Sequence, residues 1–561
     1  MNDVNEMPRD DRATPAPGGG HASPLAPAAL RALPSEALVT FLAGRRWFGA
    51  KGAAPRRATV RDAVPVAAEG RGYAVARVEV ELADGRVERY QLPLALRAVG
   101  GARGAPPEPQ DRSAAATGHH PSAADRRDSP PAGAAAPPDD APLVAEPAPG
   151  VALVDATFDP AFRTLLARGL EHGATYDGDG VRWMLVPLEG AEVAGLGALP
   201  VRLGGAEQSN TSMILGDRAI LKLYRKLEAG EHPDVEIARF LTTRTDFRNT
   251  PALLGTVTFV DHDRVATVAG MLQALVPGAR DAWEVALDAA RAYLRAPGDD
   301  PPNPFAEEMR ELGRVTRALH DALASDRTDP AFAPRAASGE DVAEWAERVR
   351  DMARDGTALL TRARAEGRLR AADVPVADAV LRRTPELLGD LDALALEIGS
   401  HPGERIRHHG DYHLGQVLKG ADGRYMIIDF EGEPARLLAE RRTPSSALRD
   451  VAGMLRSFAY AAASAAMERG GVGTDPAMER RSARWERAMR EAFLAGYQER
   501  GRAPFLPAEP QAMLHLVMLF EMEKVFYELA YELNNRPDWV WIPLRGIGRL
   551  LGSPSLPRRG A

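Results

Sequence analysis

One stretch of this 561-residue chain constrains its fold more than any other: residues 407–418, taken together with residues 425–434. The first run contains His-Gly-Asp-x-His-x-x-Gln, and the second is an apolar strand that ends in Asp-Phe-Glu-Gly-Glu-Pro. Phosphoryl transfer needs a carboxylate at the attacking hydroxyl and further oxygen ligands for Mg²⁺. The spacing predicts that Asp411 orients or deprotonates the hydroxyl and that Gln416 and Asp429 hold Mg²⁺. A polar loop and hairpin that carry acids by chance are the alternative.

A lysine within an apolar strand indicates the nucleotide side of the site. Lys222 lies in residues 219–224, where an unpaired charge would be costly, and Glu236 on the following helix is its expected partner. A strand lysine paired with a helix glutamate holds the α- and β-phosphates of ATP in kinases. Residues 200–215 read as a strand, a glycine-containing loop and a strand. Three polar residues of this segment are expected to face the phosphates: Ser209, Asn210 and Thr211.

The stretch 265–278 is expected to end the small lobe, because a strand there runs into a Pro-Gly break. Its backbone around Gln273 and Val276 would contact the adenine of ATP. Apolar residues at helical spacing then predict a mostly helical large lobe. The expected helices cover 281–294, 304–324, 341–366, 372–398, 446–466, 477–498 and 512–533.

The N-terminal part of the chain divides by composition. Residues 1–24 are predicted to be a disordered tail, and residues 25–99 a small cap that contains a helix over 28–42 and a β-hairpin over 72–96. Residues 100–147 hold no aromatic residue and are rich in Ala and Pro, which predicts a flexible insertion. Residues 148–277 would then form the β-rich N-lobe and residues 278–561 the helical C-lobe.

Composition excludes several classes of function. The chain has no cysteine, so disulfides, thiolate nucleophiles and cysteine zinc sites are ruled out. A net charge of −8 argues against a nucleic-acid partner. No stretch of about 18 apolar residues is present, so no membrane partner is expected. The N-terminus lacks the pattern of a signal peptide, which favours a cytoplasmic location.

With these motifs in place, the chain resembles the aminoglycoside-phosphotransferase-like kinases, and within them the maltokinases. Gln416 stands where that superfamily usually has Asn, while residues 429–434, residues 449–458 and the run Glu-Lys-x-x-Tyr-Glu-x-x-Tyr-Glu-x-Asn-Asn-Arg-Pro-Asp-Trp follow the maltokinase pattern. The resemblance implies an α+β fold that is bilobal and protein-kinase-like, with an N-terminal cap. It also implies that Asp450 braces the catalytic loop and that His320 is structural.

The resemblance further implies an ATP- and Mg²⁺-dependent maltokinase that makes maltose 1-phosphate for α-glucan (glycogen) synthesis from trehalose, with a trehalose synthase as a possible partner. Sugar recognition uses aromatic faces together with carboxylates and amides. The closing segment of the chain, residues 512–544, has that mixture, although its aromatic residues would also suit simple packing. The candidate substrate residues are His409, His413, Glu431, Arg442, Glu523, Tyr527, Tyr531 and Asn535.

Two alternatives stay open. One is a kinase for glucosamine, an aminoglycoside or another small hydroxyl compound, and residues 429–434 favour maltose over glucosamine. The other is a non-catalytic pseudokinase that serves as a binding module. The joint presence of Asp411, Gln416, Asp429, Lys222 and Glu236 argues against it.

Overall fold

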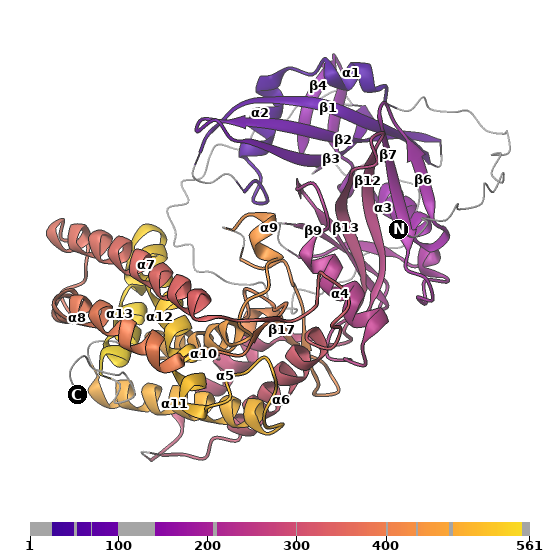
Figure 1. Cartoon of the computed structure of the whole chain (residues 1–561). Coiled ribbons are helices and arrows are strands. Elements are labelled where there is room, and N and C mark those ends of the chain that lie inside the picture. Colours follow the sequence, from indigo (N-terminus) through magenta and orange to yellow (C-terminus); the bar gives the residue numbers. More distant parts are fainter. Residues whose placement is uncertain are drawn as a thin grey trace.

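The structure, a computed structural model, describes residues 25–49, 53–68, 70–98, 141–205, 210–298, 300–399, 402–433, 436–469 and 475–552. The predicted tail and most of the predicted insertion lie outside these residues. The described chain has two lobes with a cap on the smaller one, which confirms the predicted bilobal α+β architecture (Figure 1).

The cap is a six-stranded antiparallel sheet with two short helices against its first strand (Figure 1). Its elements are α1 (Pro27–Arg31), α2 (Ser35–Ala43), β1 (Pro55–Ala68), β2 (Arg71–Leu82), β3 (Val87–Ala98), β4 (Leu143–Ala148) and β5 (Val151–Asp155), with β11 (Lys226–Leu227) joining at β3. The hairpin predicted over 72–96 is confirmed as β2 and β3. The single helix expected over 28–42 is wrong, because Pro34 separates α1 from α2.

The predicted boundaries around residue 147 also need correction. β4 begins at Leu143 and pairs with β5, which in turn pairs with β3. Residues 143–155 therefore belong to the cap sheet and not to the insertion or the N-lobe. The composition of β4 gives no strand signal because its six residues include two alanines and one proline, which would otherwise indicate a loop. Pairing along one edge still satisfies its backbone.

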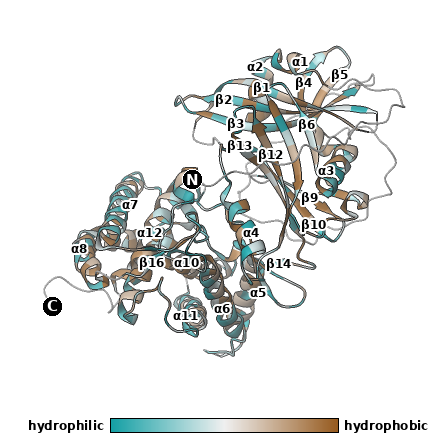
Figure 2. Ribbon diagram, turned by 45° about the vertical axis from the view of Figure 1, so that its right-hand side comes forward, coloured by the Kyte–Doolittle hydropathy of each residue, from teal (hydrophilic) through white to brown (hydrophobic). Residues whose placement is uncertain are grey.

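The N-lobe is built on a seven-stranded antiparallel sheet in the order β6-β7-β12-β13-β10-β9-β8. Its elements are α3 (Pro160–His172), β6 (Ala174–Asp177), β7 (Val181–Pro187), β8 (Val201–Leu203), β9 (Asn210–Leu215), β10 (Ala219–Tyr224), α4 (Pro233–Arg244), β12 (Leu253–Asp261) and β13 (Ala266–Ala274). Figure 2 shows the central strands as largely hydrophobic, as expected for a sheet buried on at least one face.

β10 and β11 tie the cap to the nucleotide side of the N-lobe. β10 carries Lys222, and only Arg225 separates it from β11, which pairs with β3 of the cap. The guanidinium of Arg225 is buried, bonds Asp155 at 2.7 Å and lies 5.0 Å from the ring centre of Trp47 in the cap. The strand that holds Lys222 is therefore continuous with the cap sheet.

The C-lobe is a helical assembly with one large buried core. Its helices are α5 (Ala282–Arg295), α6 (Phe305–Leu323), α7 (Gly339–Ala365), α8 (Val374–Ile398), α9 (Leu438–Arg441), α10 (Leu448–Met467), α11 (Pro476–Gln498), α12 (Pro510–Asn535) and α13 (Trp541–Leu551). Helix α10 is almost entirely buried and packs on α5, α11 and α12, as its continuous apolar sequence predicts. Among the described residues, no helix is long and apolar enough to span a membrane.

The C-lobe also contains short strands, and the last two of them lie within residues 407–434. They are β14 (Arg280–Asp281), β15 (Arg335–Ala336), β16 (Glu404–Arg405), β17 (Val417–Lys419) and β18 (Tyr425–Ile427). β17 and β18 form an antiparallel hairpin, with Val417 opposite Ile427. The loop that precedes β17 and the loop that follows β18 consequently emerge at the same end of the hairpin.

Candidate active site

The loop that carries Asp411 is held by a buried carboxylate. Asp450, at the start of α10, accepts hydrogen bonds from the backbone N–H groups of His409 at 2.8 Å and Gly410 at 2.9 Å. Its Oδ2 also lies 3.0 Å from Nε2 of His320 on α6. The structure thus confirms that Asp450 braces the loop and that His320 is structural.

Asp411 faces a lysine from the last long helix. Its Oδ1 is 3.2 Å from Nζ of Lys524 on α12, and its Oδ2 is 3.9 Å from Nε2 of His413. Burial would raise the pKa of Asp411, but Lys524 and His413 outweigh it and keep that pKa below its ordinary value. The carboxylate is therefore ionised at neutral pH and able to accept a hydrogen bond from a hydroxyl.

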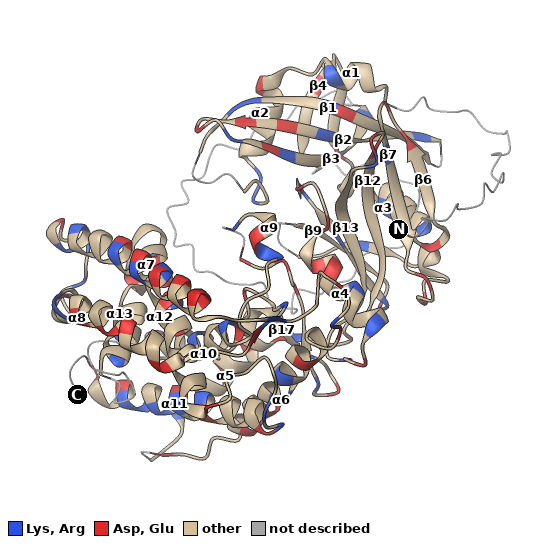
Figure 3. Cartoon of the chain, viewed as in Figure 1, with Lys and Arg blue, Asp and Glu red and all other residues tan. Residues whose placement is uncertain are grey.

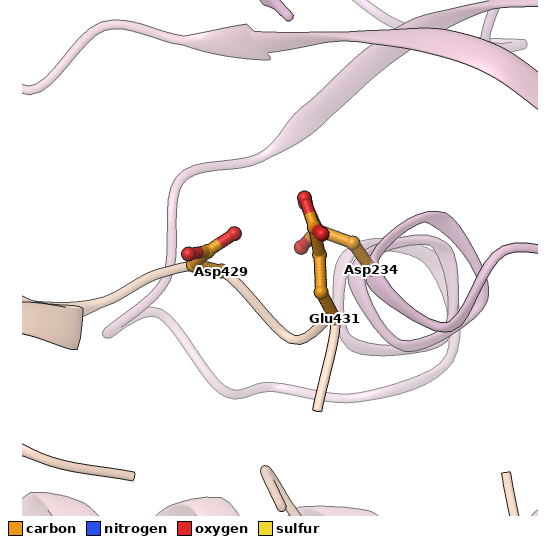
Figure 4. Close-up of side chains that lie close together, drawn as sticks. All are labelled: Asp234, Asp429 and Glu431. Atoms are coloured by element: carbon orange, nitrogen blue, oxygen red, sulfur yellow. The ribbon is translucent and has the colours of Figure 1, made fainter. Parts of the chain in front are cut away.

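Three carboxylates lie close together around Lys222 of the N-lobe. Asp234 starts α4, while Asp429 and Glu431 follow β18, and Figure 4 shows the three side chains pointing toward one another. Nζ of Lys222 lies 3.4 Å from both Asp234 Oδ2 and Asp429 Oδ1. Asn210 donates to Glu431 Oε1 at 2.8 Å. The backbone N–H of Phe430 donates to Asp234 Oδ1 at 2.9 Å, which links α4 to the segment after β18.

Asp429 sits in an unusual backbone conformation. Its φ is 70°, one of two positive values among the described residues other than glycine. Such a conformation costs on the order of 1 kcal/mol for a residue with a Cβ, and it persists where the surrounding structure fixes it. This geometry places the Asp429 carboxylate beside Lys222 and Glu431.

The structure corrects the predicted partner of Lys222. Glu236 pairs instead with Arg407 at 2.7 Å and Arg442 at 2.6 Å, and Asp234 takes its expected place beside Lys222. Asp234 lies two residues earlier on the same helix, so the two acids point in different directions. Glu236 thereby connects α4 of the N-lobe to the start of the catalytic loop.

Three carboxylates around one lysine leave an excess of negative charge. Burial and the neighbouring Asp429 and Asp234 raise the pKa of Glu431 to about 8, because a further negative charge is unfavourable there. One oxygen from each of the three acids lies within 4.8 Å of the others. This all-oxygen donor set fits a hard divalent cation such as Mg²⁺, which would be held by Asp234, Asp429 and Glu431.

The predicted metal ligand Gln416 also lies at this end of the hairpin. The backbone N–H of Ile428 donates to the carbonyl of Gln416 at 3.0 Å, so Gln416 and Asp429 are adjacent across the two segments. Gln273 is buried on β13, and Val276 lies in the connection that leads from β13 to β14. These positions agree with a hinge between the lobes, while contact with adenine stays a prediction.

A cavity of about 580 Å³ opens beside Asp411 between α7, α10, α12 and the segment after β18. Its inner wall combines aromatic rings with paired charges, a mixture suited to sugar faces and sugar hydroxyls. Glu523 Oε2 lies 2.7 Å from Arg449, and Glu433 Oε2 lies 2.7 Å from Arg436. Its lining includes Trp345, Asp411, Glu433, Arg436, Arg449, Phe520, Glu523, Lys524 and Tyr527.

Of the predicted substrate residues, Glu523 and Tyr527 line this cavity and His413 lies beside Asp411. The others do not line it. His409 is buried with Nε2 2.9 Å from the carbonyl of Ile428, and its ring packs on Phe430. Glu431 belongs to the acid cluster and Arg442 pairs with Glu236. The structure thus places these three residues outside the cavity, and their contact with a substrate stays a prediction.

Tyr531 and Asn535 lie farther along α12, outside the cavity. Tyr531 stacks near Tyr527 with ring centres 6.4 Å apart, and Asn535 donates to the carbonyl of Tyr531 at 2.8 Å. On the nucleotide side, Thr211 Oγ1 accepts from Arg225 at 2.7 Å, while Asn210 bonds Glu431. Ser209 lies outside the described residues.

Sequence reasoning missed two residues that the structure brings to the site. Residue type on α4 favours Glu236, so the sequence does not indicate Asp234. Spacing does not indicate Lys524 either, because it lies 113 positions from Asp411 and α12 reaches the catalytic loop only through tertiary packing. A signal was present for Lys524, since a lysine in a run of buried helix positions needs an acidic partner.

Comparison with known proteins gives a consistent result. The family model of the maltokinase N-terminal cap domain matches residues 41–127. The chain is 30% identical over 347 residues to a glucosamine kinase of Streptacidiphilus jiangxiensis, which covers 62% of this chain and 72% of that protein. It is 31% identical over 358 residues to a glucosamine kinase of Mycolicibacterium smegmatis, which covers 62% of this chain and 78% of that protein.

Solved structures show the same fold. A glucosamine kinase in complex with glucosamine, ADP and inorganic phosphate matches 93% of this chain and 100% of its own length, with a TM-score of 0.57 and 22% identity. A second crystal form of a glucosamine kinase matches 94% of this chain and 100% of its own length, with a TM-score of 0.61 and 22% identity. The likeness extends over the cap and both lobes.

Proposed function

The chain belongs to the family of sugar kinases that contains these glucosamine kinases, within the maltokinase and aminoglycoside-phosphotransferase-like superfamily, and from this premise we propose that it phosphorylates maltose at the anomeric hydroxyl. The anomeric oxygen attacks the γ-phosphorus of ATP, an O–P bond forms, and the bond from that phosphorus to the bridging oxygen of ADP breaks. The hydroxyl proton passes to Asp411. The products are maltose 1-phosphate and ADP.

Different residues of the site have different roles in this proposed reaction. Asp411 orients the hydroxyl and accepts its proton. Lys222 neutralises phosphate charge from β10, where Asp234 holds it in place at 3.4 Å. Asp429, Glu431 and Asp234, with the amide of Gln416, are the proposed ligands of Mg²⁺, which would supply charge neutralisation at the β- and γ-phosphates.

One observation carries the choice of a neutral sugar: the carboxylates of the inner cavity already have cationic partners. Asp411 faces Lys524, Glu433 faces Arg436, and Glu523 receives two hydrogen bonds at 2.7 Å from Arg449. A charged amine would have to displace one of these cations. A neutral sugar needs only hydrogen bonds and ring faces, which the cavity offers.

The size of the cavity favours a disaccharide. Its volume of about 580 Å³ extends from Asp411 toward Trp345 on α7, past the guanidinium of Arg449, which lies 4.4 Å from the ring centre of Phe520. One hexose at Asp411 would leave the part near Trp345 unused. Maltose places its second ring there, where aromatic and planar cationic groups form the wall.

Glucosamine is the second candidate, because the relatives at 30% and 31% identity carry that name. Its ammonium group would have to bind a carboxylate of the cavity. The trehalose synthase partner and the role in α-glucan synthesis are proposals that rest on the family resemblance alone.

The test is ATP consumption with Mg²⁺ and a panel of maltose, maltotriose, glucose, glucosamine and an aminoglycoside. We expect turnover with maltose, loss of its reducing end, and an acid-labile phosphate that distinguishes the anomeric ester from a phosphate on a primary hydroxyl. Asp411→Asn should lower kcat by about 10³-fold. Asp422→Asn, in the turn between β17 and β18, is the matched control and should change kcat less than about twofold.

Each outcome is decisive. A preference for glucosamine would keep the kinase and reject maltose. No turnover of any compound, with ATP still bound, would favour the non-catalytic alternative. An Asp411→Asn variant as active as the parent chain would remove Asp411 from the mechanism.

A further inference from the structure

We infer that Lys524 is a further catalytic residue, whose ammonium group binds the transferring phosphoryl group as it moves from ATP to the acceptor oxygen. The inference rests on the proposed phosphoryl transfer, and it does not depend on which sugar is the acceptor. Its starting point is the distance of 3.2 Å between Lys524 Nζ and Asp411 Oδ1, across 113 positions of sequence.

Helix α12 is fixed on both sides of Lys524 by buried ion pairs. Glu523, the preceding residue, bonds Arg449 through both carboxylate oxygens. One turn later, Glu528 lies 2.6 Å from Arg456, and both side chains are buried. These contacts hold the backbone of α12 in one position relative to α10, and α10 holds the catalytic loop through Asp450. Helix α10 thus holds both α12, which carries Lys524, and the loop that carries Asp411.

The ammonium group of Lys524 has N–H donors that are not used by Asp411. An ammonium group offers three N–H donors, and within the described part of the chain Asp411 is its one hydrogen-bond partner. Its side chain is 29% exposed and lines the sugar cavity, with Nζ 5.3 Å from the ring centre of Tyr527. The remaining donors are therefore available to a ligand that reaches Asp411.

The negative charge that faces Lys524 moves from Asp411 to the phosphoryl group during the proposed transfer. Before transfer, Lys524 faces the Asp411 carboxylate. During transfer, the hydroxyl proton moves to Asp411, the bond between the γ-phosphorus and ADP breaks with its electron pair on ADP, and the new phosphate ester carries negative charge beside the same site. Lys524 stays protonated and exchanges its neutralised partner for the phosphoryl oxygens. An interaction that strengthens during the reaction lowers the barrier.

The surrounding charges support this role. Burial would lower the pKa of Lys524, but Asp411, Glu433 and Glu528 outweigh it and keep the pKa above its ordinary value. Lys524 is therefore a permanent cation in the working pH range. Asp411 in turn faces Lys524, His413 and His409. Removal of the Lys524 charge should raise the pKa of Asp411 and shift the acid limb of the pH–rate profile to higher pH.

The first test compares Lys524→Met with Lys524→Arg. We expect Lys524→Met to lower kcat by about 10²–10³-fold, with less than about threefold change in the KM for ATP and for the sugar. Lys524→Arg keeps the charge and should retain activity within about tenfold. Lys226→Met is the matched control, because it breaks a lysine–glutamate pair of 2.7 Å in the cap, and it should leave kcat within about twofold.

The second test does not need turnover. Binding of ADP with Mg²⁺ and fluoroaluminate, a mimic of the phosphoryl group in transfer, is measured by calorimetry against ADP with Mg²⁺ alone. Lys524→Met should weaken the fluoroaluminate complex at least about tenfold and leave ADP binding unchanged. Equal weakening of both, or of neither, overturns the inference, as does a kcat within threefold of the parent chain.

The two tests separate the possible failures. If the parent chain phosphorylates no sugar, the proposed function fails, while the fluoroaluminate measurement still decides the role of Lys524. If Lys524→Met does not fold, as judged by its thermal transition, Lys524→Gln and Lys524→Arg take its place in the same assay. A purely structural lysine would lower the melting temperature without weakening the fluoroaluminate complex relative to the ADP complex.

Discussion

The two sides of the cleft balance their carboxylates differently. On the nucleotide side, Asp234, Asp429 and Glu431 share one lysine, Lys222. On the sugar side, three carboxylates around Asp411 have cationic partners: Asp411 faces Lys524, Glu433 faces Arg436, and Glu523 faces Arg449, Arg436 and Arg348. Figure 3 shows acidic positions on α4 and charges of both signs on α9.

This difference corresponds to the kind of ligand that each side suits. An undercompensated carboxylate cluster is stabilised when a divalent cation enters, and until then it holds a proton, as the raised pKa of Glu431 indicates. A compensated set gains nothing from a cationic ligand and offers its remaining lone pairs and N–H groups to hydroxyls. We therefore propose that the nucleotide side serves charge neutralisation and that the sugar side serves sugar recognition.

The largest expected effect comes from the undercompensated side. Asp429→Asn removes one proposed Mg²⁺ ligand and the partner of Lys222 at 3.4 Å, so we expect kcat to fall about 10³-fold at saturating ATP. The measurement is steady-state ATP consumption with maltose over a Mg²⁺ titration. The half-saturating Mg²⁺ concentration should rise as well, because the remaining acids bind the cation less tightly.

Asp422→Asn is the control for this experiment, since Asp422 lies in the turn of the same hairpin and bonds only the backbone N–H of Arg424 among the described residues. Its kcat and Mg²⁺ dependence should match the parent chain. An Asp429→Asn variant with normal Mg²⁺ dependence would show that the cluster is not the metal site, and the contrast between the two sides would lose its functional meaning.

Much of the fold could be predicted because it depends on local patterns. The helices α5, α6, α10 and α11 lie within two or three residues of their predicted ranges, since apolar residues at helical spacing define them. The errors occur where nonlocal pairing decides. The short strand β4 is ordered by its neighbour β5, and its composition alone indicates loop. A proline inside an otherwise helical pattern separated α1 from α2.

The candidate site shows the same division. Asp411, Gln416 and Asp429 could be proposed from the sequence because one continuous segment supplies all three. Asp450 could be proposed because its position resembles that of the buried aspartate that holds the catalytic loop in kinases. The partner of Lys222 was predicted incorrectly, since residue type favours Glu236 while the geometry of α4 favours Asp234. Lys524 needs knowledge of how α12 packs on the catalytic loop, which spacing does not provide.

A second prediction concerns stability on the compensated side. Glu523 is 5% exposed and faces three arginines. Arg436 keeps its pair with Glu433, but Glu523→Gln leaves the mostly buried Arg449 without its carboxylate partner. We expect a loss of about 3 kcal/mol in the free energy of unfolding, measured by urea denaturation. Glu347→Gln on α7 weakens exposed pairs with Arg350 and Arg354 and should leave the free energy of unfolding close to that of the parent chain. Equal losses in both variants would contradict the view that the inner pairs are tightly coupled.

The smallest expected effect is a loss of stability as the pH rises, and it comes from the nucleotide side. The pKa of Glu431 rises from the ordinary 4.5 to about 8 in the folded chain, so between these pH values the folded state holds a proton that the unfolded state has released. This contribution to stability is fully present below about pH 4.5 and is lost as the pH rises through 8. In the absence of Mg²⁺ we expect about 1–2 kcal/mol less stability at pH 8 than at pH 6.

Glu431→Gln isolates that contribution, because the amide keeps the shape of the side chain and cannot titrate. Urea denaturation of both proteins at pH 6 and pH 8, with a chelator present, should show a smaller pH-dependent loss in the variant. Saturating Mg²⁺ should restore stability to the parent chain at pH 8, since a cation that binds only the folded state adds to its stability. If the parent chain and the variant lose stability equally between pH 6 and pH 8, Glu431 is ionised throughout, and the nucleotide side is as well compensated as the sugar side.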